Sequence, residues 1–252
     1  MTISAADSPL VTKRLHAELW NRFGREKYPA EWDGRSYGGG TLSQRYWEYF
    51  KTIELLDLTS ESVVLDIGGG SPETGVGFFA SLIATAVKKV VVMDSNINEG
   101  SFGCGNLEVF GHLADEKTLA EAFTRWPEIS HVSCVSVLEH VPPDVRRSIM
   151  KGINDGFQGQ RLVLTLEYHA KRRFFEHQLT TRSLAETLNP LDRFYPCRME
   201  ASPVLAENAY VHTKMRVPGP PAMFKIWKRW FTRTQVDIPC WYPLAIAFES
   251  SR

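Results

Sequence analysis

The stretch that decides the fold is VVLDIGGGSPETG, which runs from Val63 to Gly75. In it, a short apolar run containing Asp66 leads directly into Gly68, Gly69 and Gly70. An apolar run bounded by glycine predicts a buried strand that ends at a turn. Glycine at such a turn permits a positive φ and lets a ligand approach the backbone closely. The stretch therefore predicts a strand followed by a ligand-binding turn.

Strand and helix patterns alternate on both sides of this stretch. The predicted strands are 62–67, 89–94, 107–110, 131–138, 161–167 and 244–248. The predicted helices are 10–23, 42–56, 75–87, 117–125, 143–156 and 181–188. Strands alternating with helices indicate βαβ units and a mostly parallel sheet covered on both faces. The sequence therefore predicts an α/β fold with a Rossmann-like, doubly wound sheet.

Two additions flank the predicted core. Residues 1–58 form an N-terminal helical segment, and residues 59–252 form the core with an insertion at 190–243 before the last strand. Glycines stand among aromatic residues in the N-terminal segment at 28–47, a composition that suits a lid closing over bound ligands. We therefore expect these additions to recognise the acceptor of any reaction.

Composition limits the class of protein. The chain has 252 residues, with 29 basic and 29 acidic side chains and no net charge, so no global nucleic-acid footprint is present. None of its four cysteines lies in a C-x-x-C pair, which argues against a disulfide framework or a zinc site. No secretory signal is evident, and no apolar run reaches the roughly 18 residues that span a bilayer. We expect a cytoplasmic protein, with peripheral contact to the inner membrane surface through 214–233 left open, and we assign no metal ligands.

The glycine turn and the second strand together indicate the ligand. A dinucleotide fingerprint, G-x-G-x-x-G, would need glycine where Glu73 stands, and an acid there would repel a pyrophosphate. The strand 89–94 ends in Asp94, and a carboxylate at this edge can accept both hydroxyls of a ribose. An adenosine-containing ligand without a pyrophosphate fits, which points to S-adenosylmethionine.

Three motifs resemble those of class I S-adenosylmethionine-dependent methyltransferases. They are VVLDIGGGSP, VVVMDSN and VSVLEHVP, in the family's order, and the resemblance covers roughly residues 45–190 and the strand 244–248. It implies a sheet of about seven strands with an antiparallel last strand. The chain departs from the family in lacking the usual third glycine, with Pro72 nearby, and in having Ser130 where aspartate is common. These departures leave the path of the loop open.

The resemblance also implies the roles of residues. Asp66, Gly68 and Gly70 would lie along the methionine part of the cofactor, and Asp94 would bind the ribose. The loop 113–115 would flank the adenine, and the segment 136–140 would line the floor beneath the reactive methyl group. The cofactor-binding residues expected on this basis are Asp66, Gly68, Gly69, Gly70, Asp94, Ser95, Asp115, Ser136 and Leu138. S-adenosyl-L-homocysteine would be the product.

Candidate bases stand at the ends of the fourth and fifth strands. His140 follows the fourth strand in LEHVP, and His169 follows the fifth in TLEYHA. Histidine suits proton transfer because its pKa lies near operating pH. We favour His169 as the base for a hydroxyl acceptor, because the fifth strand faces the acceptor side in this architecture. Glu167 could orient His169 or bind an amine, whereas Glu139 is expected to hold a backbone or cofactor group.

The acceptor is expected to be a small molecule or a glycan, and a lipid-linked or anionic acceptor fits two basic clusters. One cluster is 171–173, and the other lies within 214–233, where tryptophan and basic residues alternate as in an interfacial helix. The alternative for 214–233 is an amphipathic helix that covers the sheet. DNA is not expected as a substrate, because the fourth strand is followed by LEHVPP rather than a D/N-P-P-Y motif.

Three alternatives to hydroxyl methylation stay open. The first is N-methylation of a small-molecule amine, which would not depend on His169. The second is a nicotinamide-dependent oxidoreductase, which Glu73 disfavours. The third is a non-catalytic scaffold that binds the cofactor without turnover.

Overall fold

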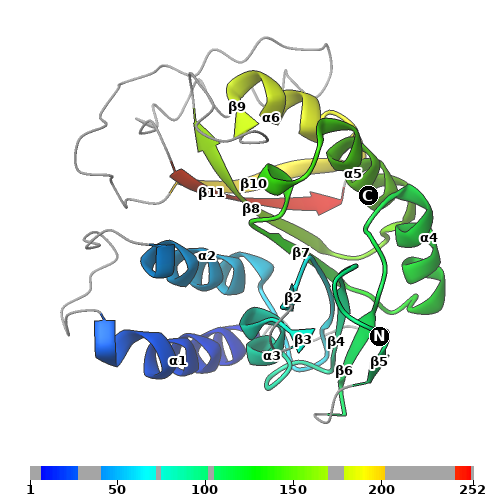
Figure 1. Cartoon of the computed structure of the whole chain (residues 1–252). Coiled ribbons are helices and arrows are strands. Elements are labelled where there is room, and N and C mark those ends of the chain that lie inside the picture. The colour runs from blue at the N-terminus through cyan, green and yellow to red at the C-terminus, as the bar shows by residue number, and fades with distance from the viewer. Residues whose placement is uncertain are drawn as a thin grey trace.

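The computed structural model describes residues 7–27, 41–71, 75–101, 105–169, 179–201 and 242–250. Within these residues, nine strands form one sheet in the order β10-β11-β8-β7-β1-β4-β6-β5, and β9 pairs with β8 (Figure 1). The longer strands are β1 (Val63–Ile67), β4 (Lys89–Met93), β6 (Leu107–Phe110), β7 (His131–Val135), β8 (Arg161–His169), β10 (Phe194–Ala201) and β11 (Tyr242–Ser250). The short strands are β5 (Gly100–Ser101) and β9 (Leu179–Thr180), while β2 (Gly70–Ser71) and β3 (Gly75–Val76) form a separate hairpin.

The centre of the sheet is parallel and one side of it is antiparallel. β1 pairs in parallel with both β4 and β7, and β7 pairs in parallel with β8. β11 runs antiparallel to both of its neighbours, β8 and β10. The predicted doubly wound α/β sheet with an antiparallel last strand is therefore confirmed.

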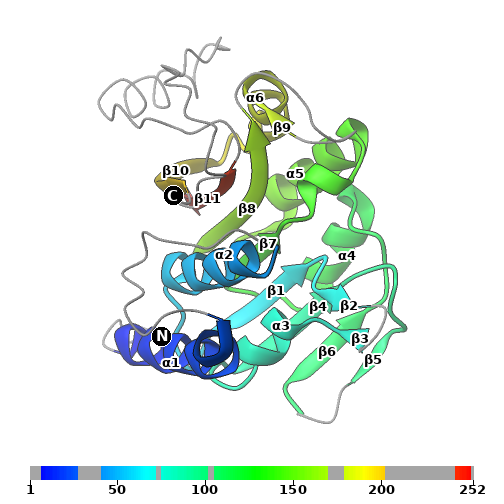
Figure 2. The same ribbon diagram turned by 60° about the vertical axis from the view of Figure 1, so that its left-hand side comes forward.

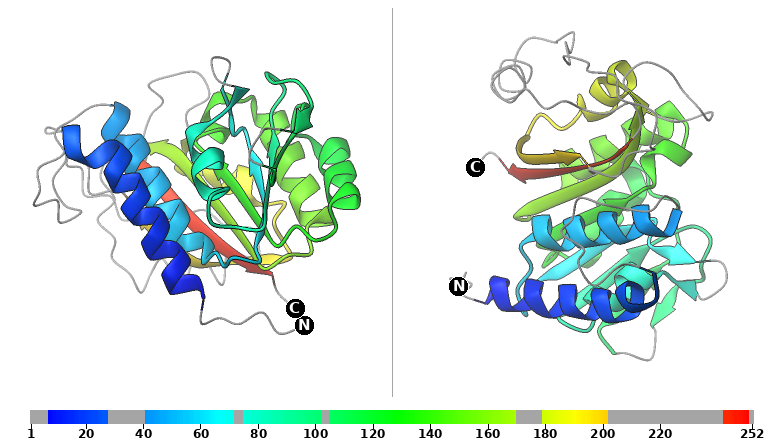
Figure 3. Two further views of the ribbon diagram at one scale, coloured as in Figure 1. Left: turned by 90° about the horizontal axis from the view of Figure 1, so that it is seen from below. Right: turned by 90° about the vertical axis from the view of Figure 1, so that its left-hand side faces the viewer.

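Helices cover both faces of the sheet (Figure 3). On one face lie α1 (Ser8–Lys27), α2 (Thr41–Leu56) and α3 (Phe78–Ile83), and on the other lie α4 (Glu116–Arg125), α5 (Pro143–Gly156) and α6 (Thr181–Leu188). Alternate residues of a strand point to opposite faces. In β1, Val63 and Leu65 accordingly pack with α4 and α5, whereas Val64 packs with α1 to α3. A strand buried on both faces explains the uninterrupted apolar run that the sequence shows.

The predicted elements differ from the structure at several places, and the short strands β2, β3, β5 and β9 were not predicted. The helix expected at 75–87 is wrong at both ends, because Gly75 and Val76 pair with β2 and α3 covers only Phe78–Ile83. The strand expected at 131–138 ends at Val135. A short 3-10 helix, η1 (Leu138–His140), follows it. β10 was not predicted, because its sequence FYPCRMEA mixes proline and charged residues and gives no clear alternation.

No helix among the described residues is long and apolar enough to cross a membrane. The predicted lid at 28–47 is wrong over 41–47, because these residues belong to α2 and the side chains of Tyr46 and Trp47 are buried in the core. The rest of that segment, 28–40, and the basic segments 171–173 and 214–233 lie outside the described residues.

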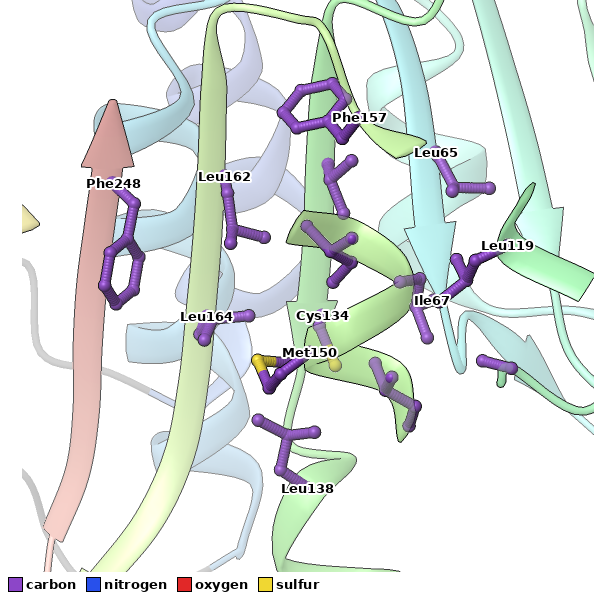
Figure 4. Packing of buried hydrophobic residues seen from close by; sticks show 14 of the residues in the cluster. Leu65, Ile67, Leu119, Cys134, Leu138, Met150, Phe157, Leu162, Leu164 and Phe248 are labelled. Carbon is purple, nitrogen blue, oxygen red and sulfur yellow. The ribbon is translucent and has the colours of Figure 1, made fainter. Parts of the chain in front are cut away.

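The core between the sheet and α5 generates a stability prediction. Leu164 of β8 is fully buried beside Cys134 and Met150 (Figure 4). Leu164→Ala should lower the free energy of unfolding by about 2–5 kcal/mol, because it removes apolar contacts and leaves a cavity. Urea denaturation would measure this change. Leu10→Ala is the control, because Leu10 is 67% exposed and its truncation should change stability by no more than about 0.5 kcal/mol. Equal losses in the two variants would contradict the assigned packing.

Candidate functional site

The glycine run passes directly over side chains at the carboxyl end of the sheet. Gly68 has φ +73°, and its N–H donates to the carbonyl of Met93 at 2.8 Å. A Cβ on Gly68 would lie 2.3 Å from Cγ2 of Val137, and a Cβ on Gly69 would lie 2.1 Å from Oδ2 of Asp66. Any side chain at either position would therefore displace its neighbours. The glycines serve the packing of the protein itself as well as any ligand.

Gly70 lies in the same way on Asp94, the residue that follows β4. A Cβ on Gly70 would lie 2.6 Å from Cγ of Asp94. The N–H of Gly70 donates to Oδ2 of Asp94 at 3.0 Å, and the N–H of Asn96 donates to Oδ1 at 2.8 Å. Two backbone donors therefore fix this carboxylate at the edge of the sheet. A carboxylate offers about four lone-pair sites, so it retains acceptor capacity for ligand hydroxyls.

Asp66, in β1, is a buried acid beneath the glycine turn. Its side chain is 1% exposed, and Oδ1 accepts a hydrogen bond from the hydroxyl of Ser133 at 2.7 Å. Burial raises the pKa of Asp66 to about 7, and the nearby charge of Asp94 adds to the increase, while the bond from Ser133 opposes it. Near neutral pH, Asp66 is therefore partly protonated, whereas an exposed aspartate would be ionised.

The backbone after the glycines forms a hairpin before it enters a helix (Figure 2). β2 and β3 pair antiparallel, and the N–H of Gly77 donates to the carbonyl of Gly69 at 2.7 Å. The helix N-terminus that we expected at Gly75 is therefore absent from that place, since α3 starts only at Phe78. Pro72 and Glu73 lie outside the described residues.

The end of β7 is held by a buried carboxylate from the N-terminal helix α2. Ser136 has φ +51°, and its N–H donates to the carbonyl of Thr165 at 3.0 Å. Its hydroxyl donates to Oε1 of Glu48 at 2.5 Å, and the side chains of both residues are buried. Glu48 was not identified from the sequence. The available signal was an acid between aromatic residues in YWEYF, which does not indicate a partner.

Glu139, in η1, connects β7 to β8. Its Oε1 accepts the N–H of Glu167 at 3.1 Å, as expected of a residue that holds a backbone group. Its Oε2 is buried and has no hydrogen-bond partner among the described residues. Burial, with a smaller contribution from the negative charges of Glu48 and Glu167, raises the pKa of Glu139 to about 8, although backbone hydrogen bonds to its carboxyl group oppose the increase. Glu139 is therefore mostly protonated at neutral pH.

The other predicted site residues occupy varied surroundings. Ser95 and His140 are exposed, Leu138 is fully buried in the core, and Glu167 is half-buried. Asp115 is the N-cap of α4, where Oδ1 accepts the N–H of Thr118 at 2.8 Å. His169 ends β8 and pairs with Thr180 of β9.

The structure thus brings together two groups of predicted residues at the carboxyl end of the sheet. The first group is Asp66, the three glycines and Asp94. The second is Ser136, Glu139 and Glu167, to which Glu48 is added. Val137, packed against Gly68, joins the two groups. Among the described residues, no group of three or more His, Cys, Asp or Glu side chains is placed to hold a metal ion.

Comparison with known proteins supports the fold. No family model and no curated protein matches the sequence. A structure of the small RNA methyltransferase HEN1 aligns with a TM-score of 0.51 and 11% identity, over 90% of this chain and 27% of that one. A methyltransferase from Anabaena variabilis aligns with a TM-score of 0.49 and 10% identity over 94% of each chain. A geranyl diphosphate C-methyltransferase from Streptomyces coelicolor aligns with a TM-score of 0.48 and 8% identity, over 99% of this chain and 100% of that one.

The two buried acids generate a prediction about pH. In the folded protein the pKa of Glu139 is about 8, whereas in the unfolded chain it is close to the ordinary glutamate value of 4.5. Between these values the folded state binds more protons, so stability should fall as pH rises, by up to about 1.4 kcal/mol per pH unit. Glu139→Gln has no proton to lose there and should flatten the slope. Asp66→Asn should flatten it only up to about pH 7.

Urea denaturation at a series of pH values would measure both slopes. Glu128→Gln is the matched control, because Glu128 is exposed just before β7, at the amino end of that strand and away from the site. An unchanged slope in Glu139→Gln would show that this carboxyl group is ionised in the folded protein.

Proposed function

We propose that this chain, which has the fold of class I S-adenosylmethionine-dependent methyltransferases, is itself such an enzyme. The observation that carries the proposal is the contact between the glycine turn and Asp94. The turn after β1 and the acid after β4 meet at the carboxyl edge of adjacent parallel strands, where doubly wound sheets bind their ligands. Asp94 is held there by two backbone N–H groups and keeps lone pairs for further donors.

These residues fit an adenosyl ligand in distinct ways. Asp94 would accept the ribose hydroxyls, and the backbone of Gly68 to Gly70 would lie against the methionine part of the ligand. Asp66 supports the turn from below, since Gly69 lies on its carboxyl group. The exposed Leu113, at 52% exposure, offers an apolar surface for the adenine. When bound, S-adenosylmethionine supplies a methyl group already activated on a sulfonium.

The chain's remaining task is to orient an acceptor in line with that methyl group, which is chiefly a matter of proximity. We propose a hydroxyl acceptor on a small molecule or a glycan, with His169 removing the hydroxyl proton. His169 ends β8, next to the strand β7 that carries Ser136 and Glu139 at its end. The basic segments 171–173 and 214–233 would favour an anionic or lipid-linked acceptor, and 28–40, which precedes α2, would act as the lid.

An amine acceptor is the second candidate. Glu48, Glu139 and Glu167 lie close enough for the charges of the other two to raise the pKa of Glu139. A cationic amine would relieve that repulsion, since an opposite charge favours ionised carboxylates. This observation supports N-methylation as the second candidate.

Asp94→Ala tests the cofactor site. Titration calorimetry should show binding of S-adenosylmethionine and S-adenosylhomocysteine to the wild-type chain, and no binding of NADH. Both adenosyl ligands should bind Asp94→Ala at least about tenfold more weakly, which corresponds to about 1.4 kcal/mol. Glu128→Ala, just before β7 at the amino end of that strand, should bind both ligands as the wild type does. Binding that is indifferent to Asp94 would refute the assigned site.

His169→Ala tests the acceptor chemistry. Labelled methyl transfer from S-adenosylmethionine into a small-molecule extract should fall by about 100-fold or more if a hydroxyl is methylated, because a general base is lost. Affinity for S-adenosylmethionine should be unchanged, which separates loss of the base from loss of the site. Retention of most activity by His169→Ala would reject the hydroxyl mechanism in favour of the amine.

A further inference from the structure

Glu48 is a buried acid that reaches the site from outside the predicted core domain. It lies on α2, which packs against β7, β8 and β11 (Figure 2). Its side chain is fully buried, and its carboxylate accepts the hydroxyl of Ser136 at 2.5 Å. An ionised carboxylate is costly to bury unless it is hydrogen-bonded. We therefore ask which segment this buried contact holds in place.

The residue that it holds has an unusual backbone conformation. Ser136 has φ +51°, in the left-handed region that is unfavourable for residues other than glycine. Such a conformation persists only where the surroundings fix it. Two contacts do so here: the N–H of Ser136 donates to the carbonyl of Thr165, and its hydroxyl donates to Glu48.

The conformation of Ser136 determines where the next residues lie. Val137 fills the space above Gly68, where a Cβ on the glycine would lie 2.3 Å from it. Glu139 then accepts the N–H of Glu167 on β8. A different φ at Ser136 would redirect the chain at Val137 and Glu139 together. The glycine turn and the end of β8 therefore depend on one residue whose hydroxyl is bound by Glu48.

We propose that Glu48 is a positioning residue that holds the end of β7 in the conformation in which the cofactor site is formed. In this role Glu48 acts through the hydroxyl of Ser136. This inference rests on the proposed function, because its readout is the binding of S-adenosylmethionine. It also connects α2, which contains the end of the predicted lid segment 28–47, to the floor of the site.

The first test is calorimetric titration of S-adenosylmethionine into Glu48 variants of the full chain. Glu48→Ala removes the acceptor for the Ser136 hydroxyl and should weaken binding by about tenfold or more. Glu48→Gln keeps an acceptor oxygen in nearly the same shape, so its affinity should stay within about threefold of the wild type. Glu54→Ala is the matched control and should bind as the wild type does, because Glu54 is a half-buried acid on the same helix whose ion pairs, to Lys51 and Arg198, do not involve Ser136.

The second test separates positioning from general stability. Ser136→Gly can adopt a positive φ without strain, so its own affinity for S-adenosylmethionine is the reference for a double-mutant cycle with Glu48→Ala. In that background, Glu48→Ala should weaken binding far less than it does alone, because the conformation no longer needs the carboxylate. A loss caused only by a destabilised fold would not be rescued by glycine at position 136. Thermal unfolding of each variant would establish that it is folded at the titration temperature.

The outcomes distinguish the two proposals. If the wild-type chain does not bind S-adenosylmethionine, the proposed function fails. If the wild type binds but Glu48→Ala binds equally well, or if Ser136→Gly does not reduce the effect of Glu48→Ala, the positioning role is overturned and the proposed function stands. If Glu48→Ala does not fold, the affinities of Glu48→Gln and Glu48→Leu for S-adenosylmethionine are compared in the Ser136→Gly background. Equal affinities would support the positioning role, because the conformation no longer needs an acceptor there. Weaker binding by Glu48→Leu would overturn it.

Discussion

Close contact between a backbone turn and three side chains is the constraint on which the edge of this sheet depends. Gly69 lies on Asp66, Gly70 lies on Asp94, and Gly68 lies on Val137. These side chains come from the ends of β1, β4 and β7, so the turn joins three parallel strands at one edge. Because glycine has no side chain, the turn can lie directly against the side chains at the ends of these strands. A substitution at any of the three would separate elements that the proposed site requires together.

Burial of acids at this edge sets the electrostatics of the site. Asp66 and Glu139 both have raised pKa values, because each is almost completely shielded from water. Asp94 lies at a half-exposed position, where two backbone N–H groups hold its side chain in place. The edge therefore combines one anchored acidic side chain with two buried acids whose pKa values lie near neutral pH. Such a division suits binding of a hydroxyl-bearing ligand beside groups that can exchange protons.

The N-terminal helices are part of this arrangement and do not merely cover the sheet. α2 packs on the strands β7, β8 and β11 and carries Glu48 into the layer beneath their ends. α1 packs against α2 through Leu15, Leu19 and the stacking of His16 on Phe50. The segment that the sequence sets apart from the core is thus joined to the predicted catalytic edge by a buried polar contact. Changes in this segment would be transmitted to Ser136.

The sequence by itself determined the elements whose signals are local. The run Val63 to Ile67, the proline that begins α5 and the bounds of α6 follow from apolar spacing and helix signals, and so does the place of Asp94 after a buried strand. The order of these elements sufficed for the fold, because parallel strands joined by helices have few arrangements. The predicted helix at Gly75 failed, because pairing with β2 outweighs helix propensity there.

Only the tertiary structure decided the rest. β10 is a strand because β11, which follows it along the chain after a long interval, pairs with it, and its own sequence carries no such signal. The protonation of Asp66 and Glu139 depends on the surfaces that exclude water from them. The bond from Ser136 to Glu48 joins residues 88 positions apart. Local periodicity predicts which face of an element is buried, but it does not predict which residues of other elements pack against that face. The chemistry of this site depends on those residues.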